Sequence, residues 1–273
     1  MMKEMTLQEI QSVSLEILKD VHSFCEHSNI KYSLAYGTLL GAIRHQGFIP
    51  WDDDIDIVLP RPDFERFCRE YQSSHGYTLY APEDSKSYLT FARVCDNEHT
   101  VVKTSSPWCV ESTGVWIDVF PLDGVPDEEA DFRRHVKKIR KFMMKELRLR
   151  YSKLMAFKDV SGAKEILFYL VKRLLFCHYD MASIVHDHIQ LLKSYNFDES
   201  RFYGQLCVMD YPEKEHNPQE DFTSSLKLPF CDTEFHVMNG YDDFLKRYYG
   251  NYMELPPEED RVPPQSVYKF CWK

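Results

Sequence analysis

The sequence predicts an α/β (α+β) fold, in which helices flank a small mixed sheet and a helical segment is inserted. Three patterns carry this prediction. Apolar residues recur with a helical period over residues 6–27, behind a threonine suited to cap the helix. Polar and apolar residues alternate over residues 54–59, which is typical of a strand with one buried face. A long helical pattern covers about residues 127–193.

The other elements follow from shorter patterns in chain order. Prolines at positions 60 and 62 end the alternating segment, and helical spacing resumes after them. Further helices are predicted from the turn at residues 37–38 to about residue 45, over 63–71 and over 241–248. Short strands are predicted over residues 32–36, 77–80, 89–95, 100–103, 115–120 and 234–238. We therefore divide the chain into a core (residues 1–126), a basic helical insertion (127–198) and a C-terminal part that packs back on the core (199–273).

The composition indicates a soluble, folded protein. Apolar residues make up 44% of the 273 residues and aromatic residues 14%, which can fill a core and excludes wholesale disorder. The formal charge of −10 argues against nucleic acid as a partner, because a general nucleic-acid binder carries a basic excess. No apolar run approaches the roughly 20 residues that span a bilayer, and the start of the chain has no secretory apolar core. These features predict a cytoplasmic protein.

Cysteine and histidine patterns give no support to a redox or zinc function. The 8 cysteines are scattered without a C-x-x-C pair and are interpreted as reduced thiols, mostly in the core. His178, His186 and His188 do not share one helix face, so we expect structural histidines rather than zinc ligands.

One segment carries a charge opposite to that of the chain. Residues 131–173 hold 14 Lys or Arg against 4 Asp or Glu. Such a basic amphipathic segment can lie on an anionic membrane surface, or it can hold an acceptor that bears phosphates. A solvated helix face that packs through its apolar stripe is the simpler alternative, and the sequence leaves all three open. The stripe consists of Phe132, Val136, Ile139, Met143 and Leu147.

Three acidic residues on predicted strands are candidates for a catalytic metal site. Asp54 and Asp56 point to the same face because side chains alternate along a strand, with Cα atoms roughly 7 Å apart. Asp118 is the only charge in an apolar strand, where an acid is costly unless it is paired or bound to metal. Oxygen ligands favour Mg²⁺ (or Mn²⁺), so we predict that these three acids are catalytic and hold that cation. An isolated Asp-Asp-Asp run is more often a solvated turn, but the alternation that follows argues against this interpretation.

Five further residues are candidates for binding the phosphates of a donor. Gly37 allows close approach of the backbone, and the hydroxyl of Thr38 and the helix amides can hold an anion. Arg44 and His45 can add cationic contacts, although a surface position is the simpler interpretation of His45. Trp51 can stack on a base or close the core, and the sequence does not decide between these roles.

These residues resemble the LicD family of phosphotransferases, whose fold is that of the nucleotidyltransferase superfamily, with fukutin and fukutin-related protein as distant relatives. The resemblance rests on residues 37–42, 44–45 and 47–57, on 116–124, and on 241–245, 249–257 and 261. It implies that residues 1–126 are a nucleotidyltransferase-like catalytic core. The metal motif of the superfamily then falls on Gly37, Thr38, Asp54 and Asp56, with Asp118 as the third carboxylate. It leaves the roles of Asp52 and Asp53 open.

The resemblance implies a metal-dependent transfer of phosphocholine from CDP-choline to a sugar hydroxyl of a cell-surface glycan precursor, with release of CMP. The acceptor would be of teichoic acid or lipopolysaccharide type and lipid-linked, which would place the enzyme on the inner face of the cytoplasmic membrane. Transfer of ribitol phosphate or glycerol phosphate and true nucleotidyl transfer are alternatives. A catalytically silent adaptor that binds glycan or lipid is a further one.

Overall fold

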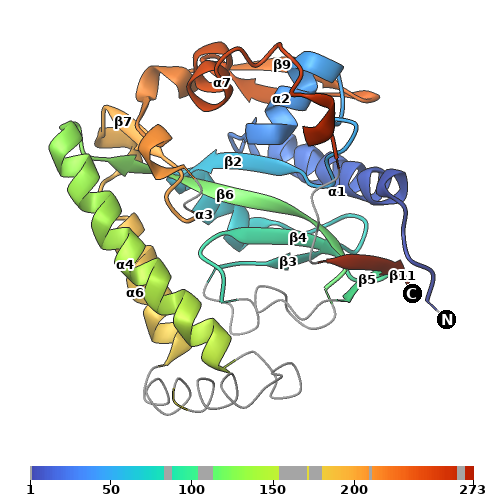
Figure 1. The fold of residues 1–273 in the computed structure, drawn as a ribbon, viewed down its shortest axis with the longest axis horizontal. Helices are drawn as coiled ribbons and strands as arrows, with labels where there is room; N and C mark the ends of the chain where they lie inside the picture. Colours follow the sequence, from blue (N-terminus) through green and yellow to red (C-terminus); the bar gives the residue numbers. More distant parts are fainter. Residues whose placement is uncertain are drawn as a thin grey trace.

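A computed structural model describes residues 2–82, 88–103, 113–153, 171, 180–208, 211–262 and 268–273. Their centre is a mixed sheet of seven strands, which confirms the α/β prediction (Figure 1). Its main path runs β1-β2-β6-β4-β3, and β7 and β8 continue from β6. Among the described strands, β2 and β6 form the parallel pair and the other pairs are antiparallel.

The strands of this sheet are β1 (Ser33–Leu34), β2 (Asp56–Pro60), β3 (Thr78–Tyr80), β4 (Ala92–Asp96), β6 (Val115–Val125), β7 (Phe202–Gly204) and β8 (Asn217–Pro218). Two smaller sheets pair β9 (Ser225–Phe230) with β10 (Thr233–Met238) and β5 (Thr100–Lys103) with β11 (Lys269–Trp272). The described α-helices are α1 (Leu7–Ser28), α2 (Tyr36–His45), α3 (Arg61–Glu70), α4 (Glu129–Lys153), α6 (Met181–Leu192) and α7 (Tyr241–Tyr249).

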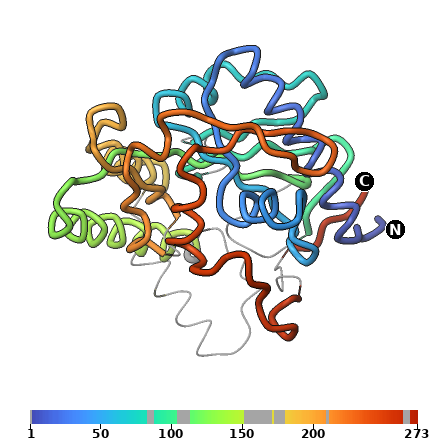
Figure 2. The backbone as a smooth tube through the Cα atoms, turned by 90° about the horizontal axis from the view of Figure 1, so that it is seen from above, coloured from blue at the N-terminus to red at the C-terminus, as the bar shows by residue number. Residues whose placement is uncertain are grey.

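The helices cover the sheet on different sides. α1 and α3 pack against the sheet strands, while α2 contacts α7 and β9 above it. α4 and α6 lie side by side at one end of the molecule (Figure 1). The view from above shows the two chain ends close together (Figure 2). No helix in the described segments is both long and apolar enough to cross a bilayer.

Local sequence explains where two of these helices begin. α1 starts behind Thr6 with a capping box: the Thr6 hydroxyl accepts from the Glu9 amide, and the Glu9 carboxylate accepts from the Thr6 amide. α2 starts at Tyr36, whose φ of 46° turns the chain sharply out of β1. This turn limits the strand predicted over residues 32–36 to two residues.

Two strand boundaries differ from the prediction. β2 begins at Asp56 rather than Asp54, because the ladder to β1 starts where the Ala35 amide donates to the Asp56 carbonyl. β6 was predicted to end at Phe120 but runs on to Val125, since its second half pairs with β7. β7, β8, β9 and β11 were not predicted, and residues 154–170 and 172–179 of the long helical pattern lie outside the described residues.

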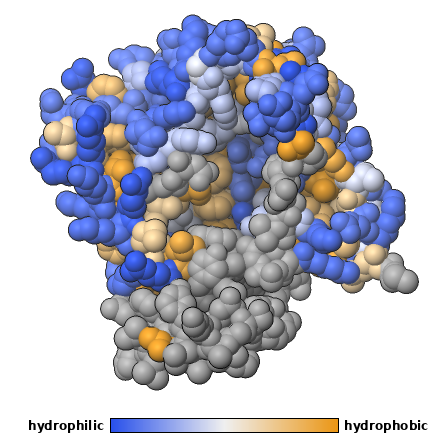
Figure 3. Space-filling view, in the orientation of Figure 1, coloured by the Kyte–Doolittle hydropathy of each residue, from blue (hydrophilic) through white to orange (hydrophobic). Residues whose placement is uncertain are grey.

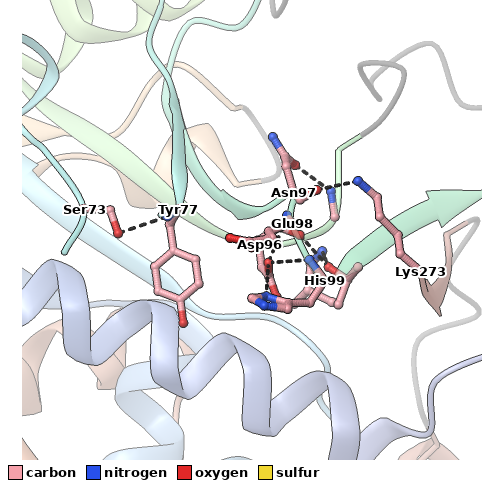
Figure 4. Close-up of polar contacts among 10 residues, drawn as sticks. Ser73, Tyr77, Asp96, Asn97, Glu98, His99 and Lys273 are labelled. Carbon is pink, nitrogen blue, oxygen red and sulfur yellow. Dashed lines mark hydrogen bonds and ion pairs between the residues drawn. The ribbon is translucent and has the colours of Figure 1, made fainter. Parts of the chain in front are cut away.

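Hydrogen bonds hold the C-terminus at the turn between β4 and β5 (Figure 4). Asp96 is buried, and its Oδ1 accepts from the amides of Glu98 and His99 at 3.2 and 3.1 Å. The Lys273 ammonium donates to the Asn97 carbonyl. Both chain ends are thereby attached to the same edge, since the Trp272 amide also donates to the Lys3 carbonyl at 2.9 Å.

The described cysteines agree with the expectation of unpaired thiols. Cys25, Cys95, Cys207 and Cys271 are buried and Cys68 is partly buried, whereas Cys231 is exposed. Two more, Cys109 and Cys177, lie outside the described residues.

Candidate active site

Asp56 and Asp118 lie directly opposite each other on the parallel strands β2 and β6. Paired residues on adjacent strands point to the same face, and Ile55 and Ile57 are fully buried on the other. Asp54 joins the two acids in the wall of a cavity of about 460 Å³. The sequence predicted this placement of a third acid on a neighbouring strand. The space-filling view shows a hollow near the centre of the molecular surface that it draws, beside apolar side chains (Figure 3).

Gly37 and Thr38 set the position of these acids. The buried hydroxyl of Thr38 accepts a hydrogen bond from the Asp56 amide at 2.8 Å, which ties the first turn of α2 to the start of β2. A Cβ atom at Gly37 would lie 2.8 Å from Oδ2 of Asp52, so only glycine leaves that carboxylate in place. The helix turn therefore fixes both the strand and the acidic loop before it.

Burial and mutual repulsion disfavour the charged forms of the clustered acids. Burial raises the pKa of Asp52, and the charge of Asp53 adds to this effect. The pKa of Asp54 is raised further, first by burial and then by the charges of Asp56, Asp52, Asp53 and Asp118. The side chain of Asp54 is exposed to solvent at the mouth of this group of acids. Such a group of acids is stable in its ionised form only beside a positive charge.

One positive charge comes from Arg93 on β4, opposite Asp118 in the strand register. Its Nε donates to Oδ1 of Asp118 at 2.6 Å, and a longer contact of 3.4 Å joins Nη2 to Oδ2. The guanidinium lies 4.4 Å from the ring centre of Trp116 and 5.3 Å from that of Phe91. Burial alone lowers the pKa of Arg93, and the charge and hydrogen bond of Asp118 more than offset this, so the net shift is upward.

The donor chemistry of the acids fits a divalent cation. Carboxylate oxygens are the ligands that Mg²⁺ prefers, and a cation would relieve the repulsion around Asp54. Within the described residues, however, these acids do not form a trio with ligand atoms all within 4.8 Å of one another. The group that does lies on α1 and β10 and consists of His22, Glu26 and His236. Because Asp118 is bound to Arg93, Asp54 and Asp56 are the acids best placed to hold a cation.

Helices α4 and α6 supply the opposite wall of this cavity. Arg150 and Glu146 are buried there and form an ion pair of 2.7 Å. Nδ1 of His188 on α6 donates to Oε2 of Glu146 at 3.0 Å, and the buried Nε2 of His188 has no hydrogen-bond partner among the described residues. Burial lowers the pKa of Arg150, and the nearby Arg93 adds to the lowering. Arg150 thus faces the acidic strands across the cavity, while Arg93 lies beside Asp118 on the sheet.

A second cavity, of about 260 Å³, adjoins the first and shares Asp56, Phe120 and Val208 with it. Its wall is rich in aromatic rings. The carboxylate of Glu215 is buried there and accepts hydrogen bonds from the hydroxyl groups of Tyr36 and Tyr248. The aromatic residues of this cavity are Tyr36, Phe120, Tyr211, Tyr248 and Tyr249.

Comparison with known proteins agrees with this site. The family model described as LicD/FKTN/FKRP, nucleotidyltransferase domain matches residues 29–161, which include all three predicted acids. The lipopolysaccharide cholinephosphotransferase LicD of Haemophilus influenzae is 35% identical over 272 residues, which cover 96% of this chain and 97% of that protein. The chain belongs to the LicD family. An uncharacterised protein of Rickettsia typhi is 46% identical over 97 residues, which cover 34% of this chain and 30% of that protein.

In this LicD family member, three of the predicted donor-binding residues lie away from both cavities. Arg44 donates to His45 at 3.0 Å and to the Tyr252 carbonyl at 3.1 Å, so it anchors the C-terminal loop. His45 lies edge-on to Trp51, with ring centres 6.5 Å apart. Burial lowers the pKa of His45, and the Arg44 charge adds to this. Gly37 and Thr38 lie behind the acids, and their neighbour Tyr36 lines the smaller cavity.

Several residues that line the two cavities were not predicted from the sequence. Arg93 carried a usable signal, because it is a lone charge in an apolar strand as Asp118 is. Glu146 and Arg150 stand four residues apart on a helix, a spacing that predicts an ion pair but not its burial. Glu215 lies in a polar loop sequence and carried no signal of its own.

Proposed function

We propose that this chain transfers phosphocholine from CDP-choline to a sugar hydroxyl of a lipopolysaccharide-type acceptor and releases CMP, with Mg²⁺ as its cation. Two kinds of support exist. The relative from Haemophilus influenzae bears the name lipopolysaccharide cholinephosphotransferase and aligns over nearly the whole chain. The structure adds a cavity whose wall combines the three predicted acids with two arginines, Arg93 on the sheet and Arg150 on α4.

The observation that carries the proposal is the pairing of Asp56 with Asp118 on parallel strands, beside Asp54. Asp54 and Asp56 would hold the cation, with water and phosphate oxygens as further ligands. When bound, Mg²⁺ would neutralise the diphosphate and stabilise the leaving CMP. Thr38 keeps Asp56 in place through its bond to the backbone amide.

Other residues of the cavity have separate tasks in this reaction. The acceptor oxygen bonds to the phosphorus that bears choline, while the bond from that phosphorus to the bridging oxygen breaks. The acceptor proton passes to a carboxylate, for which we propose Asp118. Its Oδ1 is held by Arg93 at 2.6 Å, whereas Oδ2 has only the longer contact of 3.4 Å and is better able to take the proton.

The test is an assay of the full chain with CDP-choline, lipopolysaccharide that lacks phosphocholine, and Mg²⁺. We expect CMP release together with phosphocholine on the acceptor, seen by mass spectrometry, and loss of both with excess EDTA. Asp54→Asn and Asp56→Asn should abolish transfer with unchanged circular dichroism, and Asp53→Asn serves as a neighbouring comparison. Free phosphocholine and cytidylylated acceptor would instead show nucleotidyl transfer. Absence of CMP from CDP-choline, CDP-ribitol, CDP-glycerol and CDP-ethanolamine would refute the proposal.

The exposed face of α4 is a second part of the proposal. Phe132 and Ile139 of the predicted apolar stripe are buried in the main core, so the stripe serves packing inside the protein. What remains outside is a cationic face that includes Arg133, Arg134 and Arg140. We propose that this face lies on the phosphates of the acceptor or of an anionic membrane. Sedimentation with liposomes of anionic lipid should capture the chain at low salt, and equal capture by neutral liposomes would contradict this role.

A further inference from the structure

Glu215 is a buried carboxylate that already accepts three hydrogen bonds. Its side chain is 5% exposed. Oε1 accepts from the hydroxyl groups of Tyr36, at 3.0 Å, and Tyr248. Oε2 accepts from the Gln205 amide at 2.7 Å. All three donors are neutral groups, so the negative charge is solvated but not balanced.

The nearest cations are committed to other partners. The ammonium of Lys214, the adjacent residue, donates to the Tyr248 carbonyl at 2.6 Å. Arg247 pairs with Asp221 and donates to the Asn217 side chain at 3.0 Å. Among the described residues, no Lys, Arg or His forms an ion pair with Glu215.

Aromatic rings surround the remaining space of the smaller cavity. Tyr36 and Tyr248 meet edge to face with ring centres 5.2 Å apart, and Tyr36 approaches Phe120 at 6.4 Å. These rings already attract a cation, since the Lys214 ammonium lies 4.7 Å from the ring centre of Tyr211 and 5.9 Å from that of Tyr248. Ring faces attract cations electrostatically and need no hydrogen from them.

We propose that the smaller cavity binds the quaternary ammonium of the transferred alcohol, with Glu215 as its counter-charge and the tyrosine rings as its walls. A trimethylammonium group has no N–H to donate, and Glu215 already accepts three hydrogen bonds from neutral donors, so what it offers this group is its unbalanced charge. A primary ammonium such as that of ethanolamine would exchange strong hydrogen bonds to water for contacts with ring faces, so its transfer into this aromatic wall costs more than that of a trimethylammonium group. The inference rests on the proposed function, because it places the choline end of the same donor.

The position of the cavity fits this assignment. Asp56 lines both cavities, so a phosphorus held beside it has the smaller cavity on one side and the larger one on the other. Choline joins its phosphorus through two carbons, and the head group can therefore enter the smaller cavity while the phosphorus stays at Asp56. Tyr249 lines the smaller cavity together with Asp56, so its ring is available to a head group that extends from this phosphorus.

Binding of simple cations tests the subsite without any turnover. We would titrate the full chain with choline chloride and tetramethylammonium chloride by calorimetry, and compare Glu215→Gln with Glu213→Gln, an exposed acid two residues away. We expect Glu215→Gln to weaken choline binding about tenfold or more, and Glu213→Gln to leave it unchanged. Tyr249→Leu should weaken it more than Tyr249→Phe does, and the partly exposed position of Tyr249 makes both variants compatible with folding. Equal choline affinity in wild type, Glu215→Gln and Tyr249→Leu would overturn the inference.

Donor kinetics separate this inference from the proposed function. In the transfer assay, Glu215→Gln should raise KM for CDP-choline about tenfold or more and reduce the preference for CDP-choline over CDP-ethanolamine. An active wild type whose Glu215→Gln variant keeps the same KM and preference would refute the subsite and leave the function standing. Choline binding that depends on Glu215 in a chain with no transfer activity would support the subsite and refute the proposed function.

Discussion

The buried charge of Glu215 should make the stability of the protein depend on pH in a way that one substitution removes. Burial raises the pKa of Glu215 to about 7 from an ordinary value of 4.5, and hydrogen bonds from Tyr248, Gln205 and Tyr36 oppose the rise. Between these values the folded chain holds a proton that the unfolded chain has lost, so this group lowers stability as pH increases. At about 1.4 kcal/mol for each pH unit, the loss approaches about 3 kcal/mol above pH 7.

Urea unfolding at pH 5 and pH 8 measures this effect. Glu215→Gln has no proton to lose, and the two tyrosine hydroxyl groups can rotate to satisfy its amide. The free energy of unfolding of the variant, relative to wild type, should therefore rise by about 2–3 kcal/mol from pH 5 to pH 8. Other titrating groups are common to both proteins and cancel in the difference. Glu213→Gln should show no such change, and a relative stability of Glu215→Gln that is constant with pH would refute the reasoning.

Three further predictions concern the framework of the site. Asp123→Asn should lower the free energy of unfolding, measured in urea, by about 3–5 kcal/mol, because the buried Arg61, 2.6 Å away, loses its charged partner. Arg133→Ala, which removes an exposed ion pair, should lower it by less than about 1 kcal/mol. Gly41→Ala should lower stability by about 1–3 kcal/mol, since its Cβ would lie 2.4 Å from the Gly47 carbonyl oxygen; an unchanged melting temperature would contradict this. Thr38→Val should lower both stability, by about 1–3 kcal/mol, and transfer activity, while Thr38→Ser keeps the acceptor for the Asp56 amide; equal losses in the two variants would contradict this role.

The sequence was most informative where one local pattern is enough to determine a structure. Helix α1 could be predicted from its apolar period and capping threonine, and strand β2 from the alternation around Asp56, without information on distant residues. The lone charge of Asp118 showed that this residue needs a partner. It did not show that the partner is Arg93, because that depends on β4 lying beside β6, a pairing between segments far apart in the chain.

The rest of the site depends on contacts that local sequence does not record. Glu215 follows a short 3-10 helix, and its tyrosine partners come from α2 and α7, more than 30 residues away on either side. Arg44 and His45 stand in a motif beside the acids, yet the direction of α2 carries their side chains to the C-terminal loop. Proximity in sequence therefore located the acids but did not show that these two side chains lie outside both cavities.

The charge of Glu215 bears on how the proposed donor lies across the two cavities. The smaller cavity holds Asp56 and Glu215, and its single cation, among the described residues, is Lys214 at the Tyr248 carbonyl. The larger cavity combines its acids with Arg93 and Arg150. A donor bound in reverse would place its anionic nucleotide phosphates beside Glu215 and its cationic head group beside two guanidinium groups. The first contact is repulsive, because Glu215 has no ion-pair partner among the described residues. At the second, Asp118 and Glu146 already pair with the two guanidinium groups, so the head group gains no counter-charge from that wall. The orientation that presents the choline-bearing phosphorus at Asp56 is therefore favoured by the unbalanced charge of Glu215.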